Sequence, residues 1–401
     1  KPLPEAMAKG YRVEVVGRYH NYHVTPEKWQ CMWVPPNSEK SYLIDGFSPN
    51  LNKELHVGHL RNLAVAHSLS RILPSAKFIA LLGCSLGVKK SALQGWNRWT
   101  NFVYYKPLVY HDLTLPQDVI ETVQLTDEEI LQLVKDKNLQ DANERVAEMN
   151  DLKAAKFWRG PNGPIMVIRP DGRPLYAFYD LLLAKEVAPT HYITGHEQRE
   201  HFTNLGLAEK HLPMGLILGT DGKKLKSRDG NAMSANEALD MVIDALKTPE
   251  DSQSKQIAWN ILAWNFLHAA RGTDLKFEVE KWIRPESAGM YITYTFARVL
   301  RALDYLSPTI YSLSDEKLTQ TDADLLGLSE QYLYYHAMAV KKLDPAPIAN
   351  FASDLARAIG KAYETEQIKG GREEFGGVMR HALWRLGHCM SDLGMFVVRK
   401  V

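Results

Sequence analysis

Short apolar runs and helical patterns alternate in the first part of the chain. Residues 41–46 (SYLIDG) have the length and composition of a short buried strand. Residues 77–82 (KFIALL) form a continuous apolar run that ends at Gly83, which is typical of a strand in a parallel sheet. Between these runs, apolar residues recur at helical spacing: Leu60, Ala64, Leu69, Ile72 and Leu73. The order strand, helix, strand predicts a βαβ unit.

An acidic segment interrupts this pattern. Residues 113–150 are helix-prone, and we interpret them as part of an insertion near residues 85–155 that separates two halves of a nucleotide-binding fold. After it, the pattern predicts strands at residues 164–169 and 191–194 and a helix at 175–188. We therefore expect an α/β domain with a parallel sheet over residues 41–235.

Helical spacing dominates the second half. Two sets of apolar residues each share one helix face: Phe351, Leu355, Ile359 and Ala362, and Leu383, Leu386, Met390 and Leu393. This pattern predicts an all-α bundle over residues 236–401. Residues 1–40 form an N-terminal extension to which the sequence assigns no role.

Composition narrows the class of protein. A chain of 401 residues favours two or three domains, and its net charge of +1 argues neither for nor against nucleic acid. The three cysteines are widely separated and include no CxxC pair, which fits buried thiols in a reducing compartment better than disulfides or a structural zinc site. We find no signal-peptide pattern and no run of 18 apolar residues, so we expect a cytoplasmic enzyme without a membrane partner.

Two histidines flank a glycine in HVGH, residues 56–59. Nucleotidyl transfer gathers negative charge on phosphoryl oxygens, so catalysis depends mainly on positioning and electrostatics. The imidazoles of His56 and His59 and the helix N-terminus could bind those oxygens, and Gly58 and the adjoining Leu60 would lie beside the nucleotide. A surface pair that arises by chance is the alternative interpretation.

A basic loop, residues 222–230 (GKKLKSRDG), is the second candidate motif. Lys223 and Lys226 could neutralise the β and γ phosphates of ATP, Ser227 could donate a hydrogen bond to the same group, and Gly222 would let the loop close. Alone, such a stretch is more often a solvated turn. Its occurrence together with HVGH, with strands and helices between them, predicts an ATP site.

These segments resemble a known family. The chain is similar to class I aminoacyl-tRNA synthetases, and specifically to the arginyl-tRNA synthetases, over residues 41–75 and 160–401. SPNLNKELHVGHLRN resembles the family's SPN-x-x-K-x-x-H-x-G-H-L-R-S block, and GTDGKKLKSRDG resembles its GKDGKPFKTRxG segment. MYITYTFARV resembles its Y-x-x-Y-x-x-A-R segment. The resemblance implies a Rossmann-type catalytic domain, a helical anticodon-binding domain, and ATP-dependent ligation of arginine to tRNA, with Mg²⁺ accompanying ATP.

The resemblance also implies an amino-acid pocket. The matching positions are Asp45, Ser48, Asn50, Tyr176, Asp180 and Gln198. In the family, the Tyr and Asp on one helix bind the guanidinium group, and the Asn and Gln contact the α-amino group. Two carboxylates aimed at one planar fork of N–H donors suit a cationic side chain. Without the resemblance, Tyr176 would be interpreted as core packing and Asp180 as an exposed helix charge.

The chain also departs from the family pattern. Where the family has NHVGDWGTQFG, this chain has LLGCSLGVKKSALQGW, which lacks the polar His, Asp and Gln. We also expect the family's N-terminal tRNA-elbow domain to be missing, as in a short form or paralogue. These departures leave two alternatives open: a ligase or transferase that uses a small acceptor, and an inactive RNA-binding paralogue.

Basic and aromatic residues occur together in the helical half. Tyr291, Tyr294, Arg298 and Arg301 could contact phosphates and splayed bases of a tRNA. Aromatic residues on helices more often pack in a core, which is the competing interpretation. The sequence indicates no metal site of the protein's own, and we expect a monomer.

Overall fold

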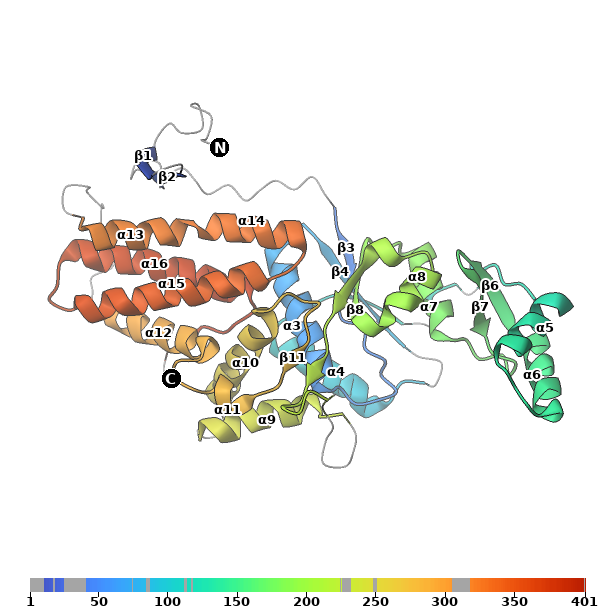
Figure 1. Ribbon diagram of the computed structural model, residues 1–401. Helices are drawn as coiled ribbons and strands as arrows, with labels where there is room; N and C mark the ends of the chain where they lie inside the picture. The colour runs from blue at the N-terminus through green and yellow to red at the C-terminus, as the bar shows by residue number, and fades with distance from the viewer. Residues whose placement is uncertain are drawn as a thin grey trace. The chain divides into compact units, whose positions relative to one another are not determined.

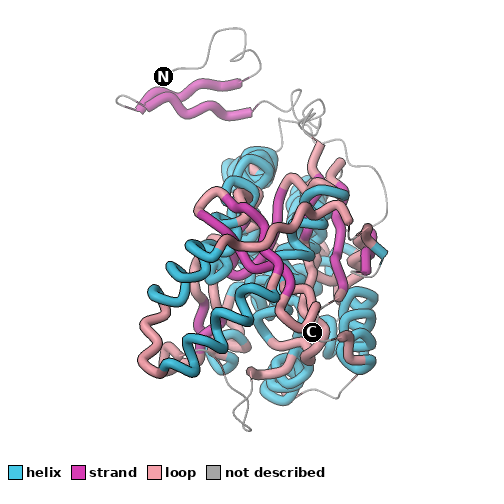
Figure 2. Tube along the Cα trace, turned by 90° about the vertical axis from the view of Figure 1, so that its right-hand side faces the viewer, coloured by secondary structure: helices cyan, strands magenta, loops and turns pink. Residues whose placement is uncertain are grey.

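The computed structural model describes residues 11–16, 19–24, 41–73, 75–83, 87–111, 114–116, 118–223, 225, 232–247, 251–304, 318–399 and 401. Within them the chain divides into two compact units. We call residues 41–238 and 271–277 the α/β unit. We call residues 239–270 and 278–401 the helical unit; β1 (Tyr11–Val16) and β2 (Tyr19–Val24), an antiparallel hairpin visible as two adjacent magenta strands in Figure 2, are grouped with it.

The α/β unit is built on a five-stranded parallel sheet (Figure 1). Its strands, in spatial order, are β5 (Leu108–His111), β4 (Lys77–Leu82), β3 (Leu43–Asp45), β8 (His191–Gly195) and β9 (His211–Met214). The central residue Ile44 pairs with Phe78 on one side and His191 on the other. Strand order reverses between β3 and β8, and ligands of such sheets bind outside the carboxyl ends of the strands at this switch point.

Helices connect these parallel strands. They are α3 (Val57–Ile72), α4 (Lys90–Phe102), α7 (Tyr176–Glu186) and α8 (Arg199–Asn204), with short 3₁₀ turns at His196–Gln198 and Ala208–Lys210. Because strand β4 is covered on both faces, its residues alternate little and are mostly buried, as the apolar run KFIALL predicted. The expected Rossmann-type parallel sheet followed by helices is confirmed.

The acidic segment folds into a small subdomain of the α/β unit. It contains α5 (Asp127–Asp136), α6 (Ala142–Ala154) and an antiparallel hairpin of β6 (Lys156–Gly160) and β7 (Gly163–Ile168), which lie side by side in Figure 1. Thr126 and Asp141 cap the two helices by accepting hydrogen bonds from backbone N–H groups of the first turn. The strand expected at residues 164–169 therefore pairs with β6 and lies outside the five-stranded sheet.

The helical unit is built from helices of different lengths. Beside α9 (Ala235–Leu246), which begins in the α/β unit, these are α10 (Ser252–Leu267), α11 (Val279–Trp282), α12 (Ala288–Leu303), α13 (Gln320–Glu330), α14 (Tyr332–Lys342), α15 (Ala346–Thr365) and α16 (Glu373–Asp392). The two apolar faces expected on residues 351–362 and 383–393 are buried on α15 and α16. Among the described residues, no helix is long and apolar enough to cross a membrane.

Residues 271–277 interrupt the helical half. They contain the short strand β11 (Leu275–Lys276), which pairs in parallel with β10 (Ile217–Leu218) of the α/β unit. The segment therefore belongs to the α/β unit, although the chain on both sides of it belongs to the helical unit. The sequence pattern, which placed all residues after 235 in one bundle, did not indicate this return.

Candidate active site

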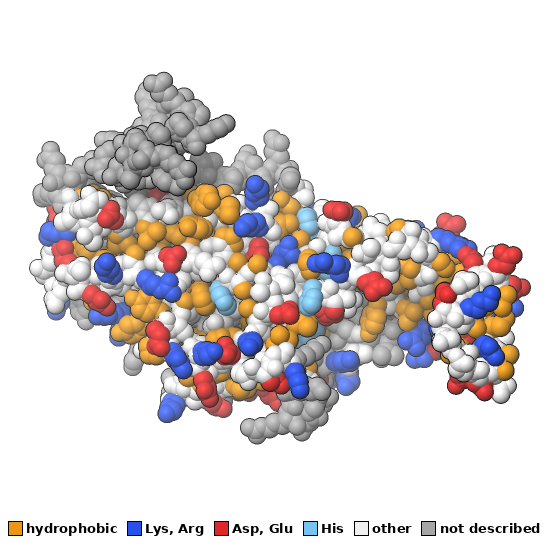
Figure 3. All heavy atoms as spheres, in the orientation of Figure 1, with side chains coloured by type: hydrophobic (Ala, Val, Ile, Leu, Met, Phe, Trp, Pro, Cys, Tyr) orange, Lys and Arg blue, Asp and Glu red, His pale blue; other side chains and the backbone are white. Residues whose placement is uncertain are grey.

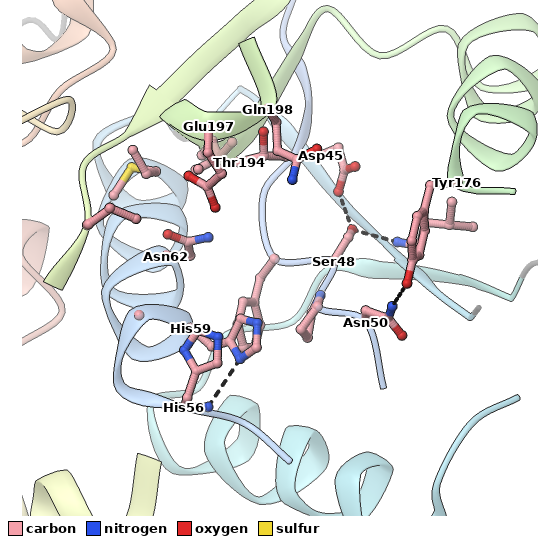
Figure 4. Close-up of a pocket in the computed structure, with 18 of the residues that line it drawn as sticks. Asp45, Ser48, Asn50, His56, His59, Asn62, Tyr176, Thr194, Glu197 and Gln198 are labelled. Carbon is pink, nitrogen blue, oxygen red and sulfur yellow. Dashed lines mark hydrogen bonds between the residues drawn. The ribbon is translucent and has the colours of Figure 1, made fainter. Parts of the chain in front are cut away.

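A cavity of about 430 Å³ opens at the carboxyl ends of β3 and β8, at the switch point of the sheet. Its size falls in the range of sites for small molecules. Its walls come from the β3–α3 loop, the first turns of α3, the helix α7, the turn after β8 and the segment 214–217. Figure 4 shows His56 and His59 on one side of this cavity and Asn50 and Tyr176 on another.

The two histidines stand at the N-terminus of α3. His56 is the N-cap residue, and the backbone N–H of His56 donates a hydrogen bond to Nδ1 of His59 over 3.1 Å (Figure 4). The rings stack with centroids 3.7 Å apart. Because Nδ1 of His59 is an acceptor, a neutral His59 carries its proton on Nε2. That ring therefore offers an N–H donor at a helix end whose dipole already favours anions.

Gly58 permits this arrangement. A Cβ at this position would lie 3.0–3.1 Å from the ring atoms of His56, which is tighter than ordinary van der Waals contact. Gly58 therefore makes room for the His56 ring as well as lining the cavity itself. Leu60, by contrast, is fully buried in the core and does not line the cavity, because its side chain lies on the inner face of α3.

Asp45 is the last residue of β3 and is only 6% exposed. Its Oδ1 accepts a hydrogen bond from Ser48 Oγ, and Ser48 Oγ in turn accepts one from the backbone N–H of Leu81 over 2.8 Å. Burial raises the pKa of Asp45 to about 7; the Ser48 hydrogen bond opposes this rise, and repulsion from Asp180 adds to it. A cation that enters the cavity would stabilise the ionised form of this carboxyl.

The helix α7 contributes two of the expected pocket residues. Tyr176, 51% exposed, opens the helix, and its hydroxyl accepts a hydrogen bond from Asn50 Nδ2. Asp180, one turn later, has its Oδ2 2.6 Å from Nε2 of His201 on α8. The structure thus brings Asp45, Ser48, Asn50, Tyr176 and Asp180 to one cavity. Their acceptor oxygens suit a ligand rich in N–H donors.

The turn after β8 supplies another wall. Gln198, which the resemblance assigned to the α-amino group, lines the cavity together with Glu197 and Thr194 (Figure 4). Thr194 Oγ1 lies 2.9 Å from Nε2 of His211 on β9, which fixes its orientation. Three further residues line the cavity that no sequence motif indicated: Glu197, Thr194 and Asn62 of α3. Asn62 lies three residues after His59, so helical spacing alone could have indicated it.

One described residue of the basic loop and one just after it reach the cavity. Leu225 and Ala232 line it, and the backbone N–H of Val57 donates to the carbonyl of Met233 over 2.9 Å. Lys226 and Ser227 lie outside the described residues. Gly222, with φ +77°, and Lys223 form an exposed turn, in which Lys223 N–H donates to Asp221 Oδ1; neither residue lines the cavity.

The residues considered for RNA contact lie on α12 in the helical unit. Tyr294, Arg298 and Arg301 are exposed on it, and Tyr291 is half-buried against Gly360 of α15. The Arg298 guanidinium lies 4.7 Å from the ring centroid of Tyr363 on α15. Basic and acidic side chains are interspersed on the face of the molecule seen in Figure 3.

Comparisons with known proteins agree with this geometry. No protein-family model matches the chain. An arginine–tRNA ligase of Latilactobacillus sakei is 25% identical over 420 residues, which cover 81% of this chain and 73% of that protein. One from Clostridium perfringens is 23% identical and covers 94% of this chain and 86% of that protein.

Solved structures show the same fold. The arginyl-tRNA synthetase of Plasmodium falciparum superposes with a TM-score of 0.69 at 14% identity, covering 98% of this chain and 86% of that one. The arginyl-tRNA synthetase of Thermus thermophilus gives 0.66 at 15% identity, covering 100% and 90%. A methionyl-tRNA synthetase of Mycobacterium tuberculosis, in complex with methionyl-adenylate, gives 0.53 at 11% identity, covering 88% and 90%.

The parallel sheet, the histidine pair at its first helix and the helices that follow are the fold of a class I aminoacyl-tRNA synthetase. In sequence, the chain is similar to arginine–tRNA ligases over most of its length. The family resemblance drawn from the sequence motifs is confirmed.

Proposed function

We propose that this protein activates arginine with ATP as arginyl-adenylate and transfers the arginine to the 3′ end of a tRNA. The observation that supports this most is the shared cavity, which has two histidines at one side and the carboxylates of Asp45 and Asp180 at another. A chain with homologues named arginine–tRNA ligase thus offers paired negative charge for a guanidinium group and N–H donors for phosphates.

We assign the amino-acid side of the cavity to arginine. Asp45 and Asp180 would accept hydrogen bonds from the guanidinium group, with Tyr176 beside them. Asn50, Ser48 and Gln198 would orient the α-amino and carboxyl ends. The hydrogen bonds Asn50–Tyr176, Ser48–Asp45 and His201–Asp180 hold these side chains in place before a ligand arrives, which reduces the ordering cost of binding.

We assign the other side to ATP. In the first step, the carboxylate of arginine attacks the α-phosphorus and pyrophosphate leaves, so negative charge shifts onto the leaving group. His56 and His59 would donate to phosphoryl oxygens, and Gly58 leaves the backbone accessible. The loop residues Lys223, Lys226 and Ser227, with Gly222 at the turn, would neutralise the pyrophosphate when the loop closes.

Mg²⁺ would enter with ATP. Within the described ranges, no group of three or more His, Cys, Asp or Glu side chains could hold a metal ion. Magnesium beside a nucleotide is usually coordinated by phosphate oxygens and water, so we expect ATP to supply most ligands of the ion. When bound, the ion would supply positive charge at the phosphates.

We further propose that the helical unit is the anticodon-binding part, with Tyr291, Tyr294, Arg298 and Arg301 on α12 in contact with RNA. The exposure of Tyr294, Arg298 and Arg301, at helical spacing along one face, supports this assignment. We also propose a cytoplasmic location, because the three cysteines are widely separated in the sequence and fit free thiols in a reducing compartment.

Pyrophosphate exchange with each amino acid, with and without tRNA, tests the function. Arginine-specific exchange together with formation of arginyl-tRNA is the expected result. Exchange without tRNA charging would instead indicate a ligase that uses a small acceptor. RNA binding without exchange would indicate an inactive paralogue, and either result would overturn the proposal.

A further inference from the structure

The segment 271–277 forms several hydrogen bonds with the cavity wall at residues 213–218. The backbone N–H groups of Leu275 and Phe277 donate to the carbonyls of Leu216 and Leu218 over 2.9 and 2.8 Å. The N–H of Gly215 donates to the carbonyl of Arg271 over 2.8 Å. The side chain of Asp274 completes the set, because its Oδ1 accepts a hydrogen bond from the N–H of Leu216 over 2.7 Å.

Gly215 is required for this contact. A Cβ at position 215 would overlap the backbone of Thr273 and Asp274, so the two chains approach as closely as a glycine allows. On its other side, the carbonyl of Gly215 accepts a 2.9 Å hydrogen bond from the buried guanidinium of Arg61. Gly215 is thus held between α3 and the segment 271–277.

This wall lines the same cavity as the histidine pair. Arg61 lies five residues after His56 on α3, and Gly215, Leu216 and Ile217 line the same cavity as His56. The chain then leaves β10 at Leu218 and turns at Gly219, whose N–H donates to the carbonyl of Lys223 over 2.7 Å. The position of β10 therefore sets the start of the basic loop.

Asp274 also reaches a second wall. Its Oδ1 lies 3.6 Å from Nε2 of His196, which precedes Glu197 and Gln198 in the turn after β8. One carboxylate therefore stands between the wall at Leu216 and the turn that carries two cavity residues. A hydrogen bond from a backbone N–H to a carboxylate is strong and directional. Asp274 can therefore fix the distance between Leu216 and the turn at His196.

We propose that the segment 271–277 positions the nucleotide side of the cavity, and that Asp274 is the positioning residue within it. This inference rests on the proposed function. The segment connects α10 to α11, two helices of the helical unit, but it packs in the α/β unit against residues 213–218. Asp274 does not line the cavity and acts on ATP through Leu216 and its neighbours.

Three variants of the full chain test this inference by pyrophosphate exchange with arginine. Asp274→Ala removes the acceptor, and we expect the KM for ATP to rise about tenfold while the KM for arginine rises by a clearly smaller factor, because Asp274 also contacts the turn that carries Gln198. Asp274→Asn keeps an oxygen that can accept from Leu216 N–H, and it should restore most of the affinity for ATP. Asp141→Ala is the matched control, because Asp141 also accepts from backbone N–H groups but caps α6 away from the cavity.

The control should lose thermal stability comparably and keep both KM values. Equal rises in the two KM values for Asp274→Ala, no rise at all, or failure of Asp274→Asn to restore ATP affinity would each overturn the inference. If the parent chain exchanges pyrophosphate with no amino acid, the proposed function fails by itself. Equilibrium dialysis with radiolabelled ATP then decides on Asp274, with weaker binding by Asp274→Ala supporting the inference and unchanged binding overturning it.

Discussion

Nε2 of His201 lies 2.6 Å from Oδ2 of Asp180, so the carboxylate proposed to bind arginine is already oriented by a partner on the next helix. Both side chains are about a quarter exposed, at 26% and 27%, and therefore remain accessible to a ligand. His201 contacts only Oδ2 of Asp180, so Oδ1 can accept a hydrogen bond from a guanidinium group.

The Asp180–His201 pair yields a first prediction. Asp180→Ala should weaken arginine binding by about 2 kcal/mol, because a charged hydrogen-bond acceptor is lost. This loss corresponds to a roughly thirtyfold rise in the KM for arginine. The KM for ATP should stay nearly unchanged. His201→Ala should raise the KM for arginine less, and His201→Gln should restore part of it. Steady-state exchange kinetics measure these values, with Asp171→Ala, which breaks an exposed pair with Arg173, as the control.

An equal loss of ATP affinity in Asp180→Ala would show that the arginine pocket is assigned wrongly. A large effect of Asp171→Ala would show that the assay reports general loss of negative charge in the α/β unit.

The raised pKa of Asp45 predicts that arginine binding depends on pH. Because its pKa is raised to about 7, much of the carboxyl is protonated below neutral pH in the free protein. A guanidinium group binds the ionised form, so the KM for arginine should fall as the pH rises from 6 to 8 and level off above that. Asp45→Asn should weaken arginine binding and flatten this dependence. A KM for arginine that is independent of pH in the parent chain would contradict the assignment.

A rising pH should strengthen arginine binding through Asp45 but lower the stability of the folded protein through the same carboxyl group. Between the ordinary pKa of Asp and about 7, the folded state binds more protons at Asp45 than the unfolded state does, so its contribution to stability falls as the pH rises through this window. Asp45→Asn should therefore melt at a higher temperature than the parent above pH 7 and lose this advantage near pH 4. Calorimetry at the two pH values measures the difference.

His59 is expected to act on the rate. His59→Ala should slow adenylate formation by about 2–4 kcal/mol in the barrier, the range found for loss of one transition-state donor. His59→Asn offers a sharper comparison, since its Oδ1 can still cap the N–H of His56 while the Nε2–H donor is absent. We expect Asn to recover thermal stability without recovering kcat. Recovery of both by His59→Asn would reduce His59 to a structural cap.

Glu330 in the helical unit is expected to act on stability alone. It is buried, and its carboxylate accepts from Nε and Nη2 of Arg385 and lies 2.9 Å from Nε2 of His381. Burial works to raise the pKa of Glu330, but the hydrogen bonds from His381 and Arg385 outweigh it and lower the pKa. Glu330→Ala leaves the Arg385 guanidinium buried without its carboxylate and should cost about 3–5 kcal/mol.

Glu330→Gln keeps one acceptor and should cost less. Urea unfolding measures both variants, and arginine activation by the folded fraction should remain at the parent rate. Equal stability of Glu330→Ala and the parent would show that the buried pair contributes nothing net.

Local patterns predicted the parts of this protein that local interactions determine. The apolar run KFIALL indicated a buried parallel strand, and HVGH stood at a helix start because His56 has the extended backbone of an N-cap. The family resemblance then selected Asp45 and Asp180, which the structure brings to one cavity. Spacing alone would not have joined them, since their proximity depends on the order of strands in the sheet.

Other features arise from pairings that leave no local pattern. The strands β10 and β11 have two residues each and are far apart in the sequence, so no periodicity marks them. The contact of Asp274 with Leu216 spans 58 positions. Leu60 directly follows His59 yet is buried in the core, because each step along a helix turns the side chain by about 100° about the helix axis.

The His56 N–H to His59 Nδ1 hydrogen bond limits which amino acids position 59 can tolerate. A replacement there must accept from the backbone through one atom and donate to a ligand through another, at opposite ends of a rigid ring. Among the twenty side chains imidazole alone meets both demands at this size. Position 59 is thus restricted by two separate demands, the capping of the N-terminus of α3 and the donation of a hydrogen bond to a ligand. A substitution that meets only one of them should impair the protein.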